Sequence, residues 1–307
     1  MRAPAKSASV VFSIPGYEGL AERVRLLVGA EAGQVERMDF PDGEHYQRVA
    51  TEVAGREVVL VGGTVDDAST LCVYDLATAL VAQEARRLSL VIPYFGYSTM
   101  ERAVRPGEAV VAKTRARLLS AIPSASYGNR VLLLDLHSEG IPHYFEGTTA
   151  VHIYGKPVIG PAIRAAGGTD FVLGSTDSGR AKWVESLAND LRVDAAFILK
   201  RRVSATETQV IALSAQVGGR SVVIYDDMIR TGGSLIGAAR AYRGAGAARL
   251  VAVCTHGVFP GDAFDRLNQT GLFDAIVATD SHPRAVALEA SGLQVVSVAE
   301  LIAEHLV

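Results

Sequence analysis

Residues 221–235 read SVVIYDDMIRTGGSL, and this stretch says most about the fold. The run Val222–Tyr225, three β-branched residues and a tyrosine, is typical of a buried strand. An acidic pair, Asp226-Asp227, follows it, and then Gly232-Gly233 opens a segment with helical spacing. A strand that passes through a glycine turn into a helix is the repeating element of α/β proteins. The stretch therefore predicts an α/β fold.

The same stretch has the chemistry of an anion site. Backbone N–H groups at a helix N-terminus attract anions, and glycines let the backbone come close to a ligand. Thr231 and Ser234 add hydroxyl donors, so a sugar phosphate could bind at this turn. The carboxylates of Asp226 and Asp227 would then face the sugar hydroxyls and a bridging magnesium, because ligands of open α/β sheets bind at the carboxyl ends of strands. A turn that only caps a helix is the simpler alternative.

Short β-branched runs alternate with longer helical patterns along the chain, which favours βαβ units around parallel sheets. Strands are expected at Val10–Ile14, Val58–Val61, Leu88–Ile92, Val131–Leu134, Phe171–Leu173, Ala196–Leu199, Val222–Tyr225 and Leu250–Cys254. Helices are expected at Asp67–Arg87, Ala109–Ala121, Arg180–Leu191 and Gly232–Arg243. The uninterrupted apolar character of Val131–Leu134 suits a strand buried on both faces.

The length of 307 residues suggests two domains, since a domain has roughly 150 residues. Hydrophobic residues make up 49% and charged residues 21%, so each half can bury its own core. A polar turn at Gly147–Thr149 is the best candidate for the boundary between the two domains. We expect one α/β domain over residues 1–149, a second over residues 150–296, and a helix over residues 297–307 that packs back on the first domain.

Charge and hydropathy exclude some classes of partner. The net charge is −3 with the signs interspersed, which offers no basic face to a nucleic acid. No apolar run approaches the roughly 18 residues of a membrane span, and Val10–Ile14 is too short for a signal-peptide core. We expect a cytoplasmic protein without nucleic-acid or membrane partners. Cys72 and Cys254 lie in apolar runs and are expected to be small buried side chains.

Further motifs occur in a fixed order along the chain. They are Phe40-Pro41-Asp42-Gly43-Glu44, Pro93-Tyr94-Phe95-Gly96-Tyr97 followed by Arg102, Asp135-Leu136-His137, Ser175-Thr176-Asp177, Lys200-Arg201-Arg202 and Thr255-His256. Residues 221–235 resemble the motif for 5-phosphoribosyl 1-diphosphate (PRPP) that type I phosphoribosyltransferases share with PRPP synthetases. The whole series resembles the ribose-phosphate pyrophosphokinase (PRPP synthetase) family. This resemblance implies two type I phosphoribosyltransferase-like domains, each a mostly parallel sheet flanked by helices.

The resemblance also implies a role for each motif. Lys200 and Arg202 would be catalytic, because diphosphoryl transfer needs positive charge near the transferred group. His137 and Asp177 would hold Mg²⁺ on the nucleotide phosphates. The implied ATP-binding residues are Phe40, Asp42, Glu44 and Arg102, and the implied ribose 5-phosphate-binding residues are Asp226, Asp227, Arg230, Thr231, Gly232, Gly233 and Ser234.

Simpler interpretations exist for the individual motifs. Residues 41–43, Pro-Asp-Gly, are also an ordinary β-turn sequence. His137 at the end of a strand is as often structural as a ligand. Residues 200–202, Lys-Arg-Arg, are on charge alone most often a solvated cluster. The order of all the motifs together, not any single one, supports the family.

The implied activity is that of a ribose-phosphate diphosphokinase. The β,γ-diphosphoryl group of MgATP is transferred to the anomeric oxygen of ribose 5-phosphate, which gives PRPP and AMP. In the family the segment that corresponds to Phe40–Glu44 reaches the adenine across a subunit boundary. The resemblance therefore implies a homo-oligomer built from dimers, up to a hexamer, with Mg²⁺ as the cofactor.

Several residues depart from the family pattern near both substrates. Thr99 and Met100 stand where the family has an arginine and a glutamine that contact ATP. Arg230 replaces an aspartate, and Thr176 replaces a proline. Trp183 lies near a position where an arginine is common.

Three interpretations of these departures remain. The first interpretation is an ordinary enzyme with compensating contacts. The second is a divergent paralogue whose nucleotide donor or sugar acceptor has changed, or which has become a regulatory subunit without catalysis. The third interpretation is a type I phosphoribosyltransferase. Such a protein would share the glycine turn but would not need the motifs at residues 40–44 and 200–202.

Overall fold

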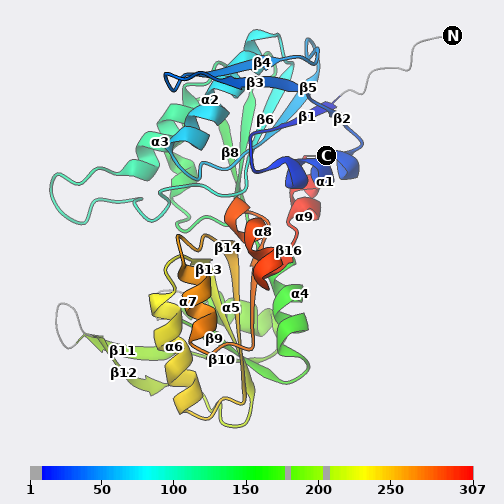
Figure 1. The fold of residues 1–307 in the computed structure, drawn as a ribbon. Helices are drawn as coiled ribbons and strands as arrows, with labels where there is room; N and C mark the ends of the chain where they lie inside the picture. Colours follow the sequence, from blue (N-terminus) through cyan, green and yellow to red (C-terminus); the bar gives the residue numbers. More distant parts are fainter. Residues whose placement is uncertain (1–8, 177–180, 203–207, 307) are drawn as a thin grey trace. The chain divides into compact units, whose positions relative to one another are not determined.

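The computed structural model describes residues 9–176, 181–202 and 208–306. The chain divides into two compact units. Unit 1 contains the residues up to Tyr154 together with those from Val298 onward, and unit 2 contains Gly155–Ser297. Each unit has its own six-stranded sheet, and Figure 1 shows the helices that flank the sheets. The expected fold class, two mostly parallel sheets flanked by helices, is confirmed.

The sheet of unit 1 is entirely parallel. Its order is β2 (Glu31–Ala32), β1 (Ser9–Ser13), β5 (Glu57–Val61), β6 (Arg87–Ile92), β7 (Asn129–Leu134) and β8 (Thr149–Ile153). The helical elements are α1 (Glu18–Val28), α2 (Asp67–Ala82), α3 (Val111–Ser120), a 3₁₀ turn at Ile141–Tyr144 and α9 (Ala299–Glu304). The inner strands β5, β6 and β7 are almost fully buried, as expected for strands covered on both faces.

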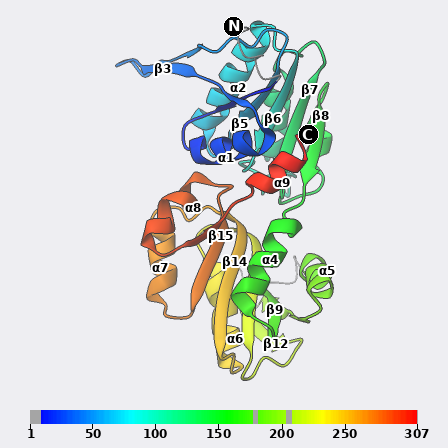
Figure 2. The same ribbon diagram turned by 90° about the vertical axis from the view of Figure 1, so that its right-hand side faces the viewer.

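An exposed hairpin extends the first unit (Figure 2). It consists of β3 (Val35–Asp39) and β4 (His45–Val49), which pair antiparallel in a sheet of their own. Most of its side chains are exposed. Residues 40–44 form the turn between the two strands.

The sheet of unit 2 is also parallel. Its order is β10 (Asp194–Ala196), β9 (Phe171–Ser175), β13 (Ser221–Ile229), β14 (Arg249–Gly257), β15 (Ala275–Thr279) and β16 (Gln294–Val296). The helices are α4 (Lys156–Gly167), α5 (Ala181–Leu191), α6 (Gly233–Gly244), α7 (Ala263–Gln269) and α8 (Pro283–Leu288), followed by a 3₁₀ turn at Glu289–Ser291. A separate antiparallel pair is formed by β11 (Ile198–Arg202) and β12 (Thr208–Leu213).

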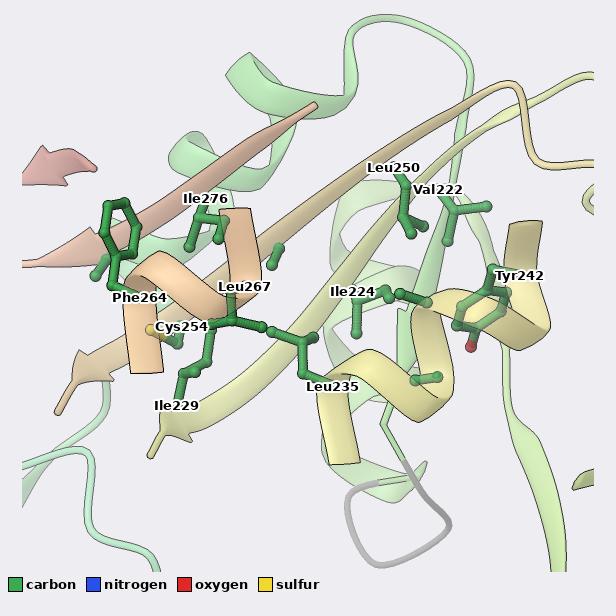
Figure 3. Close-up of a cluster of buried hydrophobic side chains, with 14 of the residues drawn as sticks. Val222, Ile224, Ile229, Leu235, Tyr242, Leu250, Cys254, Phe264, Leu267 and Ile276 are labelled. Atoms are coloured by element: carbon green, nitrogen blue, oxygen red, sulfur yellow. The ribbon is translucent and has the colours of Figure 1, made fainter. Parts of the chain in front are cut away.

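The central strand β13 supplies both cores of unit 2. Successive side chains of a strand point to opposite faces, so Val222 and Ile224 pack with residues of α6 and α7, whereas Val223 and Tyr225 pack with residues of α4 and α5. Figure 3 shows the first of these clusters between the sheet and the two helices. Because β13 is fixed from both faces, the residues that follow it start from a rigid position.

The expected elements agree with the structure except at some ends. The helix expected at Asp67–Arg87 ends at Ala82, since Glu84 has a left-handed φ of 61° and Arg87 already belongs to β6. The strand expected at Ala196–Leu199 is divided between β10 and β11. Cys254 is buried as expected, but Cys72 is only partly buried, with its Sγ 3.5 Å from Oε1 of Gln47. In the part of the chain that the structure describes, none of the helices combines the length and the hydropathy of a transmembrane segment.

Candidate functional site

The connection from β13 to α6 has the form that its sequence predicts. Arg230 and Thr231 are exposed after the strand, and α6 begins at Gly233. Gly232, the N-cap of α6, has a φ of 78° and a left-handed conformation. A Cβ at this position would lie 2.8 Å from Cδ2 of Leu267. Only glycine satisfies both conditions without strain.

The start of α6 can receive an anion. The first N–H groups of a helix have no acceptor within the helix, and they carry the positive end of its dipole. Gly233 and Ser234 in the first turn are exposed, so a ligand can approach the backbone there. Together with the Thr231 hydroxyl, this turn can bind a phosphate group.

Two carboxylates lie just before this turn. Asp226 is partly exposed, and Asp227 is only 3% exposed. Oδ1 of Asp226 accepts a hydrogen bond of 3.0 Å from the backbone N–H of Asp227. Its Oδ2 accepts one of 3.0 Å from the hydroxyl of Thr176, at the end of β9. The carboxylate of Asp226 is therefore held through both oxygens.

The residues around the acidic pair are closely packed. The ring of Trp183 on α5 stacks on Tyr225, with centroids 4.2 Å apart and planes 12° apart. The Tyr225 hydroxyl lies 3.0 Å from Oγ1 of Thr255 on β14. Burial raises the pKa of the Cys254 thiol, and the carboxylates of the acidic pair raise it further. Cys254 is thus a packed thiol and not a nucleophile.

A tyrosine on α6 joins strands β9 and β10 next to the site. The Tyr242 hydroxyl lies 3.1 Å from the carbonyl oxygen of Ser175 and 2.9 Å from that of Ala196. Burial raises the pKa of Tyr242, so the hydroxyl keeps its proton and donates. Gly174 leaves space for this ring, because a Cβ there would lie 2.8 Å from the hydroxyl oxygen. Helix α6 starts at the turn Thr231–Ser234, which we call the phosphate turn. The same helix therefore also fixes the end of β9.

Both expected catalytic residues lie on the small sheet of unit 2. Lys200 and Arg202 belong to β11, where they pair in register with Val210 and Thr208 of β12. They are part of a hairpin strand and not of a loop after a strand. Asp177, the expected magnesium ligand of this unit, lies outside the described residues.

In unit 1 the expected nucleotide segment forms the tip of the β3–β4 hairpin. Phe40 and Glu44 close the turn, with the backbone N–H of Phe40 2.8 Å from the carbonyl oxygen of Glu44. The Asp42 carboxylate accepts from the backbone N–H of Glu44 at 3.1 Å. Phe40 is 43% exposed. The turn thus presents an aromatic ring and two carboxylates to the outside.

His137 is exposed on the loop after β7. The loop turns at Asp135, which is buried and has a left-handed φ of 42°. The next backbone N–H, that of Leu136, donates to Nε2 of His152 on β8 at 2.9 Å. Burial lowers the pKa of His152, although Asp135 and Glu139 partly oppose this effect. A neutral His152 can therefore hold the loop that carries His137.

The remaining expected nucleotide contact is Arg102. Its guanidinium is 3.6 Å from the carboxylate of the neighbouring Glu101 and 79% exposed. Thr99 and Met100, which replace the two ATP-contacting residues of the family pattern, are exposed as well. These three side chains lie on the connection between β6 and α3, separate in the chain from the hairpin turn and from His137.

The metal donors can be tested against the structure. Among the residues that the structure describes, no group of three or more His, Cys, Asp or Glu side chains is placed to enclose a metal ion. The carboxylates of Asp226 and Asp227 are nevertheless the oxygen donors that Mg²⁺ prefers, and Mg²⁺ commonly takes only one or two carboxylates and leaves its other positions to phosphates and water. The acidic pair fits a magnesium bound together with a phosphorylated substrate.

Sequence reasoning missed three residues that support the site: Thr176 as a hydrogen-bond donor, His152 and Tyr242. Each acts between elements that are far apart in the chain. The departure at Thr176 was visible in the sequence, but no sequence pattern shows its partner. For His152, even the strand β8 that carries it had no clear signal.

The fold and this site define an α/β protein with a glycine turn, suited to an anion, at the carboxyl end of a parallel sheet. Residues 9–122 match the family model for the N-terminal domain of ribose phosphate pyrophosphokinase. Residues 175–307 match that of the phosphoribosyl synthetase-associated domain. The two matches cover most of the chain.

Individual relatives agree with these matches. A ribose-phosphate pyrophosphokinase of Prochlorococcus marinus (strain MIT 9313) is 33% identical over 299 residues, covering 96% of this chain and 88% of the relative. The protein of that name from Parasynechococcus marenigrum is 34% identical over 301 residues, with the same coverage of 96% and 88%. The crystal structure of a phosphoribosylpyrophosphate synthetase from Mycobacterium smegmatis superposes with a TM-score of 0.83 at 26% identity and covers 97% of both chains. The chain belongs to the ribose-phosphate pyrophosphokinase family.

Proposed function

We propose that this chain is a ribose-phosphate diphosphokinase that makes PRPP and AMP from MgATP and ribose 5-phosphate. The anomeric oxygen of the sugar forms a bond to the β-phosphorus while the bond between that phosphorus and the α,β-bridging oxygen breaks. AMP leaves with the bridging oxygen, and the hydroxyl proton of the sugar is released. Family membership supports the reaction, and the connection from β13 to α6 is the observation that supports the sugar site.

The acceptor is proposed to bind at this connection. The 5-phosphate would interact with the backbone and hydroxyl groups of Thr231–Ser234, whose exposure and helix-start position suit an anion. The ribose hydroxyls would donate to the carboxylates of Asp226 and Asp227. Arg230 is exposed beside the turn and would add a positive charge to the acceptor site.

The donor is proposed to be a magnesium complex of ATP. His137 and Asp177 are the residues proposed to hold Mg²⁺ on the nucleotide phosphates, and Asp226 and Asp227 could ligate Mg²⁺ at the acceptor. When bound, the ion would neutralise charge on the phosphate oxygens. Lys200 and Arg202 would stabilise charge on the transferred group, because phosphoryl-type transfer depends mainly on positioning and positive charge.

The nucleobase site is proposed to involve the hairpin tip. Phe40, with Asp42 and Glu44, would contact the adenine, and Arg102 would contact the nucleotide. An aromatic ring that is 43% exposed on a projecting hairpin suits a contact with a second copy of the chain. The active form is therefore proposed to be a homo-oligomer.

The test is product analysis by mass spectrometry after mixing the protein with MgATP and ribose 5-phosphate. AMP and PRPP should appear in equal amounts, and chelation of Mg²⁺ should stop both. The double variant Asp226→Asn, Asp227→Asn should lose activity, whereas Asp262→Asn, at the exposed start of α7, should keep it. Formation of neither product by the folded wild-type protein would contradict the proposal and favour the catalytically silent paralogue. PRPP consumption on addition of a nucleobase would favour a phosphoribosyltransferase.

A further inference from the structure

Thr176 directly follows β9 and lies beside the acidic pair. Ser175, the last residue of β9, pairs in register with Tyr225 of β13, so the next residues of the two strands, Thr176 and Asp226, lie side by side. Thr176 is 2% exposed, and its hydroxyl donates to Oδ2 of Asp226 at 3.0 Å. A proline, which the family pattern has here, possesses neither a hydroxyl nor an N–H group and could not make this bond.

The hydrogen bond from Thr176 restricts the orientation of the Asp226 carboxylate. Oδ1 of Asp226 accepts from the backbone N–H of Asp227 at 3.0 Å, and a bond to one oxygen permits rotation of the carboxylate about that oxygen. The bond from Thr176 to Oδ2 opposes this rotation. Each carboxylate oxygen can accept two hydrogen bonds, so one bond to each oxygen does not by itself exclude a ligand hydroxyl.

The backbone under the carboxylate is held independently. Tyr225, the preceding residue, stacks on Trp183 and approaches Thr255 with its hydroxyl. With the backbone held, the side-chain rotamer of Asp226 sets the position of its oxygens, and the hydrogen bond from Thr176 constrains that rotamer.

We propose that Thr176 is a positioning residue for the acceptor site, which orients the Asp226 carboxylate toward the hydroxyls of a sugar phosphate. The inference depends on the proposed function, in which Asp226 receives the ribose hydroxyls. An acceptor group that is fixed before binding loses less conformational freedom when the ligand arrives. The contribution of Thr176 should therefore appear in the affinity for the sugar and much less in the rate of the chemical step.

The test compares two substitutions at one position. Thr176→Val keeps the shape of the side chain and removes the donor, whereas Thr176→Ser keeps the donor. At saturating MgATP, Thr176→Val should raise KM for ribose 5-phosphate about tenfold, a size in keeping with one hydrogen bond to a charged group, with kcat nearly unchanged. Thr176→Ser should restore a KM close to that of the wild type. Thr78→Val, which removes a 2.8 Å hydroxyl bond to Tyr74 in α2 of unit 1, should leave KM unchanged.

Two further measurements decide the inference even if no PRPP is formed. Calorimetric titration with ribose 5-phosphate should show weaker binding to Thr176→Val than to the wild type, and a crystal structure of Thr176→Val should show a rotated Asp226 carboxylate. Unchanged KM or binding together with an unrotated carboxylate would overturn the positioning role. A wild-type protein that binds ribose 5-phosphate without converting it would instead count against the proposed function alone.

Discussion

Arg230 places a positive charge between the end of β13 and the phosphate turn, where the family pattern has an aspartate. Its side chain is exposed, so its interaction with a ligand is screened by solvent. Because Arg230→Asp restores the residue of the family pattern, we predict that it increases turnover of ribose 5-phosphate. The increase should be at most about fivefold, since exposed charge pairs contribute about 0–1 kcal/mol. The same variant should bind sugar phosphates with an additional anionic group more weakly. Steady-state kinetics with a panel of sugar phosphates measures both effects.

The control for Arg230 is Arg240→Asp. Arg240 is exposed on α6, two turns beyond the phosphate turn, and the same change of charge there should leave the kinetics unaltered. If Arg230→Asp changes neither affinity nor turnover for any sugar phosphate, Arg230 has no part in specificity.

His152 makes the loop of His137 sensitive to acid. Its Nε2 accepts the N–H of Leu136 at 2.9 Å and can do so only while unprotonated. Burial lowers the pKa of His152 in the folded state, whereas in the unfolded chain it has the ordinary value of about 6.5. At pH values between these two pKa values, the unfolded chain binds more protons than the folded chain. The contribution of His152 to stability is therefore complete above about pH 6.5 and decreases as the pH falls below it.

Urea unfolding at pH 7.5 and 5.5 measures this effect. The free energy of unfolding should decrease more from pH 7.5 to pH 5.5 in the wild type than in His152→Asn, because the asparagine side chain does not titrate. His143→Asn is the control, because His143 is exposed and its removal should leave the slope as in the wild type. Equal slopes for the wild type and His152→Asn would contradict the prediction.

At the scale of elements, the start of α6 depends on Gly232. Gly232 has a φ of 78°, and a Cβ at this position would lie only 2.8 Å from Leu267. We therefore predict that Gly232→Ala destabilises the protein by about 1–3 kcal/mol. Gly237→Ala in the same helix is the matched control. No atom lies within 4 Å of a Cβ there, so alanine should be neutral or stabilise by about 0.5–1 kcal/mol. Thermal unfolding of both variants checks the prediction, which fails if both behave alike.

How far the elements could be predicted depends on how their residues are buried. Continuous apolar runs such as Val131–Leu134 and Val222–Tyr225 indicated the inner strands, because both faces of those strands are covered. The β3–β4 hairpin had no comparable signal, since its side chains are mostly exposed. The overlong helix after Asp67 has another cause. Glu84 favours helices in general, and only its tertiary position requires the left-handed turn.

The site could be predicted where its residues are contiguous and not where strands bring them together. The acidic pair, the glycine turn and the start of α6 all lie within residues 226–234, so their order in the sequence is also their order in space. The bond from Thr176 to Asp226 spans 50 positions, and that from Leu136 to His152 spans 16. Such pairs depend on strand order and register, which one sequence does not specify.

At the scale of the whole molecule, unit 1 is completed by α9. Leu301 and Ile302 of this helix are buried, and α9 packs on α1. We predict that Ile302→Ala destabilises unit 1 by about 2–5 kcal/mol, the usual cost of truncating a buried isoleucine. Leu26→Ala on α1 is the control, because Leu26 is 63% exposed.

The two units can be observed separately in this experiment. Hydrogen exchange in peptides from β5 and β6 reports on unit 1, and the fluorescence of Trp183, the single tryptophan, reports on unit 2. Ile302→Ala should accelerate the exchange and leave the fluorescence transition in place. Unchanged exchange would show that α9 is not needed for the stability of unit 1.

The position of α9 in the chain has a consequence for biosynthesis. In the sequence, unit 2 separates the two parts of unit 1. The ribosome therefore makes all of residues 155–297 after β8 and before α9. At about 5–20 residues per second, unit 1 waits about 7–30 s for its last helix. During that interval unit 2 can fold first, although most of unit 1 precedes it in the chain. The face of α1 that α9 later covers has no partner from this helix for the same period.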